Sequence, residues 1–146
     1  MGKNSHPTII ADSSVAYWMS RMDLVICGAA GIAENGGVVN QIGTYQIALL
    51  ANTLGKPFYV VAESFKFARA LFPLKQTDIP LSFRQPIPFS PSQLSLIESV
   101  PSVSFDNSFF DFTPPKLITL LITDLGVITP SAVSDELIKL ERRLVE

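Results

Sequence analysis

Cysteine, histidine and charged residues are all scarce in this sequence of 146 residues. The single cysteine, Cys27, cannot form a disulfide within the chain, and no secretory leader pattern opens the sequence, so we expect a cytoplasmic protein. The single histidine, His6, stands in a polar stretch without the partners that a metal site or a catalytic site needs. We therefore expect no metal, no cofactor and no catalytic histidine.

Charged residues make up only 16% of the chain, and the formal net charge is −2. This balance leaves neither the basic footprint of a nucleic-acid-binding protein nor a polybasic patch for a membrane surface. The longest apolar runs, such as residues 47–51, are far shorter than the roughly 18 residues of a membrane span. We therefore expect no nucleic acid and no membrane among the partners. Apolar residues reach 47%, so part of the apolar surface is expected to meet another protein.

Glycine, by contrast, is concentrated in one segment, because residues 28–43 contain five of the eight glycines. An apolar run precedes this segment and a helix pattern follows it. A strand, a glycine loop and a helix N-terminus together form a natural site for a phosphate or carboxylate, which free backbone amides would bind. The spacing does not match G-x-G-x-x-G and no G-K-[ST] follows, so a dinucleotide fingerprint and a Walker loop are both excluded.

The candidate ligand-binding residues come from this loop and from the segment after the next strand. They are Asn35, Gly36, Gly37, Asn40, Gln41, Gly43, Thr44 and Lys66. A second interpretation needs no ligand: residues 35–37 form a tight turn and Asn40 caps the following helix. Asp111, much further along the chain, is expected to be a turn or cap residue rather than an acid catalyst.

Strand and helix patterns alternate in the first half of the chain. In order, we expect a strand over 7–11, a helix over 13–22 capped by Asp12, a strand over 23–29, a helix over 44–54 ended by Gly55, and a strand over 57–62. The continuous apolar run within 23–29 is typical of a strand buried on both faces of a parallel sheet. The order β-α-β-α-β predicts an α/β protein with a parallel sheet, in a single domain over 1–146.

The second half opens with a proline-rich excursion over residues 72–115, which holds eight of the eleven prolines. Within it, residues 91–98 have a helix pattern that begins at a proline. We then expect a helix over 113–126, a short strand over 127–129 and a helix that begins near residue 130. An apolar stripe follows this last helix and is either core or subunit interface: Val133, Leu137, Leu140 and Leu144.

Three long stretches resemble one known family. They are "GAAGIAENGGVVNQIGTYQIALLA", "KPFYVVAESFKFARALFPLKQTDIP" and "DFTPPKLITLLITDLGVITPSAVSDELIKL", and they resemble the alpha-subunit family of eukaryotic translation initiation factor 2B. The resemblance implies a Rossmann-like parallel sheet flanked by helices, incomplete at the N-terminal side relative to the family. It also implies a non-catalytic regulatory subunit of the guanine-nucleotide exchange factor for initiation factor 2. Such a subunit associates with the other subunits and with a second copy of itself, and it helps to sense the phosphorylated substrate. The resemblance favours the interface interpretation of the C-terminal stripe.

The same superfamily contains sugar-phosphate isomerases, such as those acting on methylthioribose 1-phosphate, which provide the alternative interpretation. The isomerases typically read G-A-D-R-I and N-K-I-G-T-Y, with an acid/base aspartate and a phosphate-binding lysine. This chain has Ala30 and Gln41 at those positions, so it lacks the proton donor and the positive charge. Residues 63–67 also follow the initiation factor rather than the isomerases. We therefore expect no enzyme, with a sugar phosphate as the candidate ligand of an isomerase-like remnant.

Overall fold

The strands of the described part of the chain form two four-stranded sheets. The computed structural model describes residues 6–68, 71, 73, 75–79, 89–100, 102 and 108–145. The strands are β1 (Val25–Cys27), β2 (Gly31–Ala33), β3 (Val38–Gln41), β4 (Phe58–Val61), β5 (Phe67–Ala68), β6 (Phe110–Thr113), β7 (Leu120–Thr123) and β8 (Gly126–Ile128). The α-helices are α1 (Val15–Met19), α2 (Thr44–Thr53), α3 (Pro91–Glu98) and α4 (Val133–Val145).

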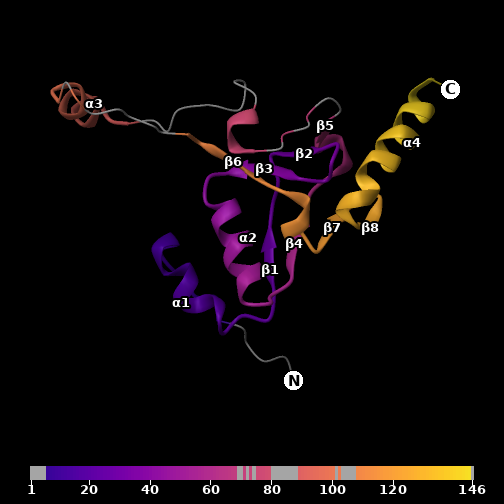
Figure 1. The fold of residues 1–146 in the computed structure, drawn as a ribbon, viewed down its shortest axis with the longest axis horizontal. Coiled ribbons are helices and arrows are strands. Elements are labelled where there is room, and N and C mark those ends of the chain that lie inside the picture. The colour runs from indigo at the N-terminus through magenta and orange to yellow at the C-terminus, as the bar shows by residue number, and fades with distance from the viewer. Residues whose placement is uncertain are drawn as a thin grey trace.

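The first sheet has the strand order β1-β4-β7-β8 (Figure 1). Strands β1, β4 and β7 run parallel, and β8 returns antiparallel to β7. Helix α2 lies between β1 and β4 in the chain, which makes the crossover that a parallel pair requires. The α/β prediction with a parallel sheet is therefore confirmed, and the predicted strands over 23–29 and 57–62 contain β1 and β4.

The second sheet has the order β5-β2-β3-β6 and was not foreseen. The predicted loop over 28–43 is in fact a β-hairpin, because β2 pairs antiparallel with β3 inside it. Strand β6 then pairs antiparallel with β3, so residues 110–113 of the predicted excursion belong to this sheet. Glycine-rich composition suggested a loop, but the hairpin is buried on both faces. Ile32 and Val38 pack in one hydrophobic cluster, and Val39 packs with Phe112 in a second.

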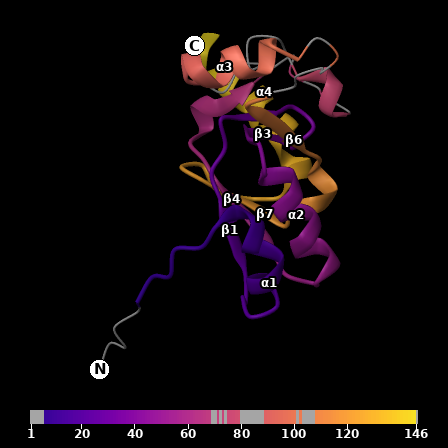
Figure 2. The ribbon, with the colours of Figure 1, turned by 90° about the vertical axis from the view of Figure 1, so that its left-hand side faces the viewer.

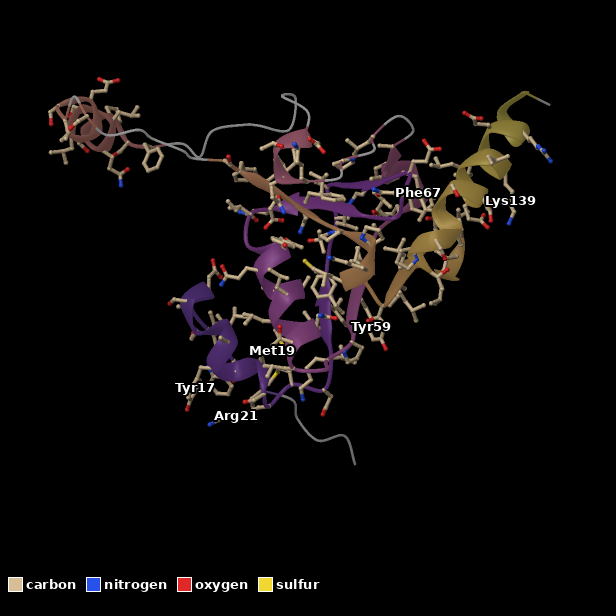
Figure 3. The ribbon with its side chains drawn as sticks, viewed as in Figure 1. Tyr17, Met19, Arg21, Tyr59, Phe67 and Lys139 are labelled. Carbon is tan, nitrogen blue, oxygen red and sulfur yellow. The ribbon has the colours of Figure 1, made fainter. Side chains whose placement is uncertain are left out.

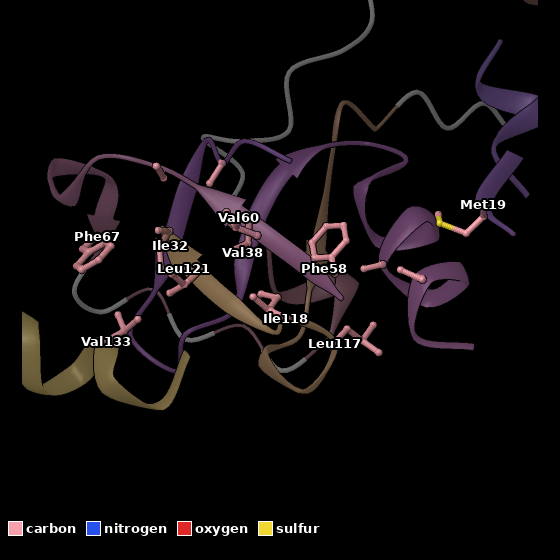
Figure 4. Packing of buried hydrophobic residues seen from close by; sticks show 14 residues of the cluster. Met19, Ile32, Val38, Phe58, Val60, Phe67, Leu117, Ile118, Leu121 and Val133 are labelled. Atoms are coloured by element: carbon pink, nitrogen blue, oxygen red, sulfur yellow. The ribbon is translucent and has the colours of Figure 1, made fainter. Parts of the chain in front are cut away.

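The two sheets share one hydrophobic core. Ile32, Val38 and Phe67 of the second sheet pack with Val60 and Leu121 of the first (Figure 4). Ala48 and Ala51 of α2, both fully buried, complete this cluster from the helix side. Helix α1 packs on α2, and its Met19 is buried in the same core, while Arg21 lies over the ring of Tyr17 at 5.1 Å (Figure 3). The core therefore fixes α2 against both sheets.

In the described part of the chain, a helical layer covers one face of the first sheet. Helices α1 and α2 lie on that side (Figures 1 and 2), and Phe58, Val60 and Leu121 point toward the core. On the opposite face Ile26 is 61% exposed and Val127 is 62% exposed, and Figure 3 shows Tyr59 on the side away from α2. The expectation that β1 is buried on both faces is therefore wrong for this chain.

Three local predictions fail. Residues 7–11 form no strand, and Ile9 is 98% exposed, because this β-branched segment has no neighbouring strand to pair with. The predicted helix over 13–22 is a 3-10 turn followed by the short α1, and Asp12 lies inside that turn instead of capping it. The predicted helix over 113–126 is instead the end of β6, a 3-10 turn, β7 and the start of β8. Its apolar run is rich in β-branched residues, and periodicity alone does not separate such a run from a buried helix.

Other local predictions are confirmed. Helix α3 matches residues 91–98, and its N-terminus is held by Ser90, whose backbone amide donates to Gln93 Oε1 at 2.9 Å. Gly55 follows α2 with a φ of 64°, the left-handed conformation expected after a helix C-cap. Helix α4 begins after a short 3-10 turn at Pro130–Ala132 and projects from the body of the fold (Figure 1).

Candidate functional site

The N-terminus of α2 is held by a side chain from the second sheet. Asp111 on β6 accepts hydrogen bonds through Oδ2 from the backbone amides of Gly43, at 2.8 Å, and Tyr45, at 3.0 Å. Antiparallel pairing of β3 with β6 places Asp111 opposite Asn40. Asn40 is three residues before Gly43, the N-cap of α2, so the pairing brings Asp111 close to the start of the helix. Asp111 is therefore a cap residue, as expected, although it caps the helix across a distance of 68 positions in sequence.

Burial controls the protonation of this carboxyl group. Asp111 is 8% exposed, and desolvation raises its pKa above the ordinary value, against the opposing effect of the two amide hydrogen bonds. Its second oxygen, Oδ1, is buried and has no hydrogen-bond partner within the part of the chain that the structure describes. The arrangement thus leaves one acceptor atom of Asp111 unused.

A second polar group lies at the C-terminal end of β1. The Asn40 amide donates to Thr44 Oγ1 at 3.0 Å and approaches Cys27 Sγ at 3.5 Å, and Thr44 Oγ1 donates to the Gln41 carbonyl at 2.7 Å. Cys27 Sγ also lies 3.9 Å from Thr44 Oγ1. The thiol is therefore surrounded by an amide and a hydroxyl, and neither group accepts a proton at neutral pH.

The segments that follow β4 and β7 are joined by hydrogen bonds between Ser64 and Asp124. Asp124 accepts from the Ser64 backbone amide at 2.6 Å and from the Ser64 hydroxyl at 2.7 Å. These hydrogen bonds lower the pKa of Asp124. The pKa of Glu63 is lowered by a backbone hydrogen bond and then by Lys66, whose Nζ lies 3.3 Å from its carboxylate. Carboxyl ends of parallel strands are where ligands bind in open α/β sheets, so this edge is the candidate site.

The predicted ligand-binding residues fall into separate groups. Asn40, Gln41, Gly43 and Thr44 lie together at the end of β3 and the start of α2. Asn35, Gly36 and Gly37 form the turn at the opposite end of the hairpin, where Asn35 Oδ1 accepts from the Gly37 amide at 2.9 Å. Lys66 pairs with Glu63. The turn interpretation of residues 35–37 is therefore confirmed.

The premise that the loop offers free backbone amides needs correction. The Gly36 amide donates to Ala33, the Ile42 amide to Phe109, and the Gly43 amide to Asp111. Asn40 does not act as the helix cap, because Gly43 occupies that position and the Asn40 side chain bonds Thr44 instead. An anion that binds the Gly43 and Tyr45 amides would have to displace the carboxylate of Asp111.

The C-terminal stripe is divided between core and surface. Val133 is fully buried in the core of the chain itself, so it is not available to an interface. Leu137 and Leu140 are partly buried and pack against the same core. The side chain of Leu144 lies outside the described residues. The described side chains of the stripe therefore belong at least in part to the core of the chain itself.

Two features escaped the sequence analysis. Gln76 pairs through its carboxamide with the backbone of Phe112, and no local pattern marks a glutamine for this role. The open face of the first sheet was also missed, although the apolar and weakly charged composition hinted at such a surface. Within the described ranges no group of three or more His, Cys, Asp or Glu residues is arranged to hold a metal ion. No helix of the described part is both long enough and apolar enough to cross a membrane.

The fold and this strand edge define a Rossmann-like α/β protein. Residues 3–130 match the Initiation factor 2 subunit family, so the chain belongs to that family. It is 50% identical over 135 residues to "Translation initiation factor eIF2B subunit alpha" of Dictyostelium discoideum, covering 90% of this chain and 42% of that protein. It is 41% identical over 139 residues to the protein of the same name from Caenorhabditis elegans, covering 94% of this chain and 43% of that protein.

A solved structure of 5-methylthioribose 1-phosphate isomerase from Pyrococcus horikoshii OT3 is also similar. It superimposes with a TM-score of 0.68 and 36% identity, covering 91% of this chain and 36% of that chain. The chain thus spans less than half the length of the curated relatives and of the solved structure. The recognition of the alpha-subunit family is confirmed by these similarities.

Proposed function

We propose that this chain is the C-terminal Rossmann-like part of a non-catalytic regulatory subunit of initiation factor 2B, the exchange factor for initiation factor 2. The subunit acts in the cytoplasm through association with the other subunits. It helps the assembly to sense phosphorylated initiation factor 2. The similarity to two alpha subunits supports this assignment over an isomerase.

One observation carries the non-catalytic assignment. Ala30 stands where the isomerase pattern has an acid/base aspartate, and it begins the hairpin with its amide bonded to the Val39 carbonyl at 3.0 Å. Cys27, the only thiol of the chain, has an amide and a hydroxyl as its polar neighbours. The described polar groups beside the thiol therefore include no base, and position 30 carries no acid.

Association is proposed to use the open face of the first sheet. Parallel sheets are normally covered on both faces, and Ile26, Val61 and Val127 are exposed on the face that α1 and α2 do not cover. This apolar area supports a homodimer and contacts with the other subunits.

The experiment mixes the purified chain with the remaining purified subunits of initiation factor 2B and follows co-sedimentation. A regulatory subunit is expected to sediment with the assembly, whereas the Ile26→Lys/Val127→Lys double variant is expected to remain free. The matched control is Asn52→Lys, which adds a charge at an exposed position on α2, outside the open face. Failure of the folded wild-type chain to join the assembly contradicts the proposal.

The second candidate is an isomerase-like enzyme or a sugar-phosphate-binding remnant. The Asn40–Thr44 group at the ends of the parallel strands favours it, together with the similarity to the isomerase structure. The expected ligand contacts are Asn40, Gln41, Thr44 and Lys66. Titration with 5-methylthioribose 1-phosphate, followed by amide NMR and by product formation, separates the cases. Saturable turnover that is lost in Cys27→Ser would overturn the non-catalytic assignment, whereas binding without turnover identifies a remnant.

A further inference from the structure

A cavity of about 470 Å³ lies beside the N-terminus of α2. It is bounded by the start of α2, by the 3-10 turn at Gln76–Asp78 and by the start of β6. Ile42, Ile79 and Phe110 supply apolar walls, and Gln46 and Gln76 supply polar groups. This mixture of apolar walls and a few polar groups is typical of small-molecule sites.

Among the described residues, Asp111 contributes an unpaired hydrogen-bond acceptor to the lining of this cavity. The residue lines the cavity, is more than nine-tenths buried, and bonds the α2 amides through Oδ2 alone. Its Oδ1 is an acceptor without a hydrogen-bond partner among the described residues. A buried carboxylate oxygen that lacks a donor is costly, so a ligand whose donor reaches this oxygen would offset that cost.

The charge of the residues that line the cavity favours one sign of ligand charge. Asp111 is the one formally charged residue among the described residues that line the cavity. Lys75 and Lys116 line an adjoining hollow of about 320 Å³ instead. A phosphate or carboxylate in the Asp111 cavity would meet a like charge, whereas an ammonium would meet an opposite one.

We propose that this cavity binds a small organic amine, with its ammonium group on Asp111 Oδ1 and an apolar or aromatic body against Ile42, Ile79 and Phe110. The site lies beyond the regulatory role proposed above and does not depend on it. Desolvation raises the pKa of Asp111, and a bound ammonium would compensate the charge that burial disfavours.

Three probes with similar bodies test the charge requirement: 2-phenylethylamine, 2-phenylethanol and 3-phenylpropionate. Each is titrated into the ¹⁵N-labelled chain, and the backbone amides of Gly43, Tyr45 and Gln46 are followed. We expect saturable shifts with the amine and at least about tenfold weaker binding of the alcohol and the acid. Equal binding of all three would reveal an unspecific apolar hollow, and the absence of saturable shifts with the amine would show that the cavity takes no such ligand. Either result overturns the proposal.

Two variants test whether the amine binds at Asp111. Asp111→Asn keeps an oxygen for the α2 amides but removes the charge, so amine binding should fall about tenfold or more. Because this variant also alters the helix cap, Gln46→Lys provides an independent test, since it adds a competing cation at an exposed position that lines the cavity. Asn52→Lys, exposed on the same helix but outside the cavity lining, is the matched control and should bind the amine like the wild type. Unchanged amine binding in folded Asp111→Asn or in Gln46→Lys contradicts the assignment.

Discussion

The carboxamide of Gln76 pairs with both backbone groups of Phe112. Gln76 Nε2 donates to the Phe112 carbonyl at 2.7 Å, and the Phe112 amide donates to Gln76 Oε1 at 2.7 Å. Strand β6 is at the edge of the second sheet, so this side chain takes the place of a neighbouring strand at one residue. The geometry explains how a turn outside the sheet protects a buried residue of its edge, because Phe112 is 2% exposed.

Replacing Gln76 by leucine should destabilise the fold by about 1–3 kcal/mol, because two backbone groups at a buried residue lose their partners. Urea unfolding monitored by circular dichroism measures the loss. Gln41→Leu is the matched control, since Gln41 is exposed, and its effect should stay within about 0.5 kcal/mol. Equal effects of the two variants would contradict the role given to Gln76.

Gly36→Ala should cost more stability than Gly55→Ala. Both glycines have positive φ, 82° and 64°, so both substitutions carry a backbone cost of about 1–2 kcal/mol. At Gly36 the new Cβ would also lie 2.1 Å from the Pro130 carbonyl oxygen, whereas Gly55 has nothing within 4 Å. The difference between the unfolding midpoints of the two variants measures the cost of the clash between residue 36, in the hairpin turn, and Pro130. Similar losses of stability in the two variants would mean that the backbone near Pro130 shifts without cost to accommodate the new Cβ.

Asp111 should make the chain less stable as pH rises through the acid range. Burial raises the pKa of this carboxyl above its ordinary value of 3.8, so the folded state holds the proton more tightly than the unfolded state. The stability that this proton contributes is complete below the ordinary pKa and is lost as pH rises through the raised one. Subtracting the unfolding free energy of Asp111→Asn from that of the wild type, between about pH 3 and pH 7, should therefore give a falling curve. Tyr45 is the other titratable side chain of the cavity lining. A rising curve would mean that the α2 amide hydrogen bonds dominate over burial.

The open face of the first sheet should control self-association. Ile26→Lys with Val127→Lys should shift the sedimenting species toward the 15.9 kDa monomer without loss of the folded signal, because both side chains are mostly exposed. Leu140→Glu tests the alternative on α4 and should destabilise the fold instead, since Leu140 packs against the core. A wild-type chain that is already monomeric at high micromolar concentration contradicts the association proposal.

The sequence by itself determined the features that rest on local patterns. The apolar runs of β1 and β4, the helix between them, the turn at residues 35–37 and the left-handed Gly55 all follow from short-range periodicity or turn chemistry. The long motifs were also sufficient to predict the family, because they extend over most of the chain.

Only the tertiary structure decided the features that rest on pairing between distant residues. The glycine-rich segment became a hairpin, and the apolar run at 118–123 contributed β7 rather than a helix, because each found a strand partner elsewhere in the chain. The same pairing brought Asp111 to the amides of Gly43 and Tyr45 and so occupied two of the donors that the composition had suggested were free. The local sequence of a segment contains its secondary-structure propensity but does not identify the strand with which it pairs. Burial and backbone hydrogen bonding to that strand outweigh the propensity.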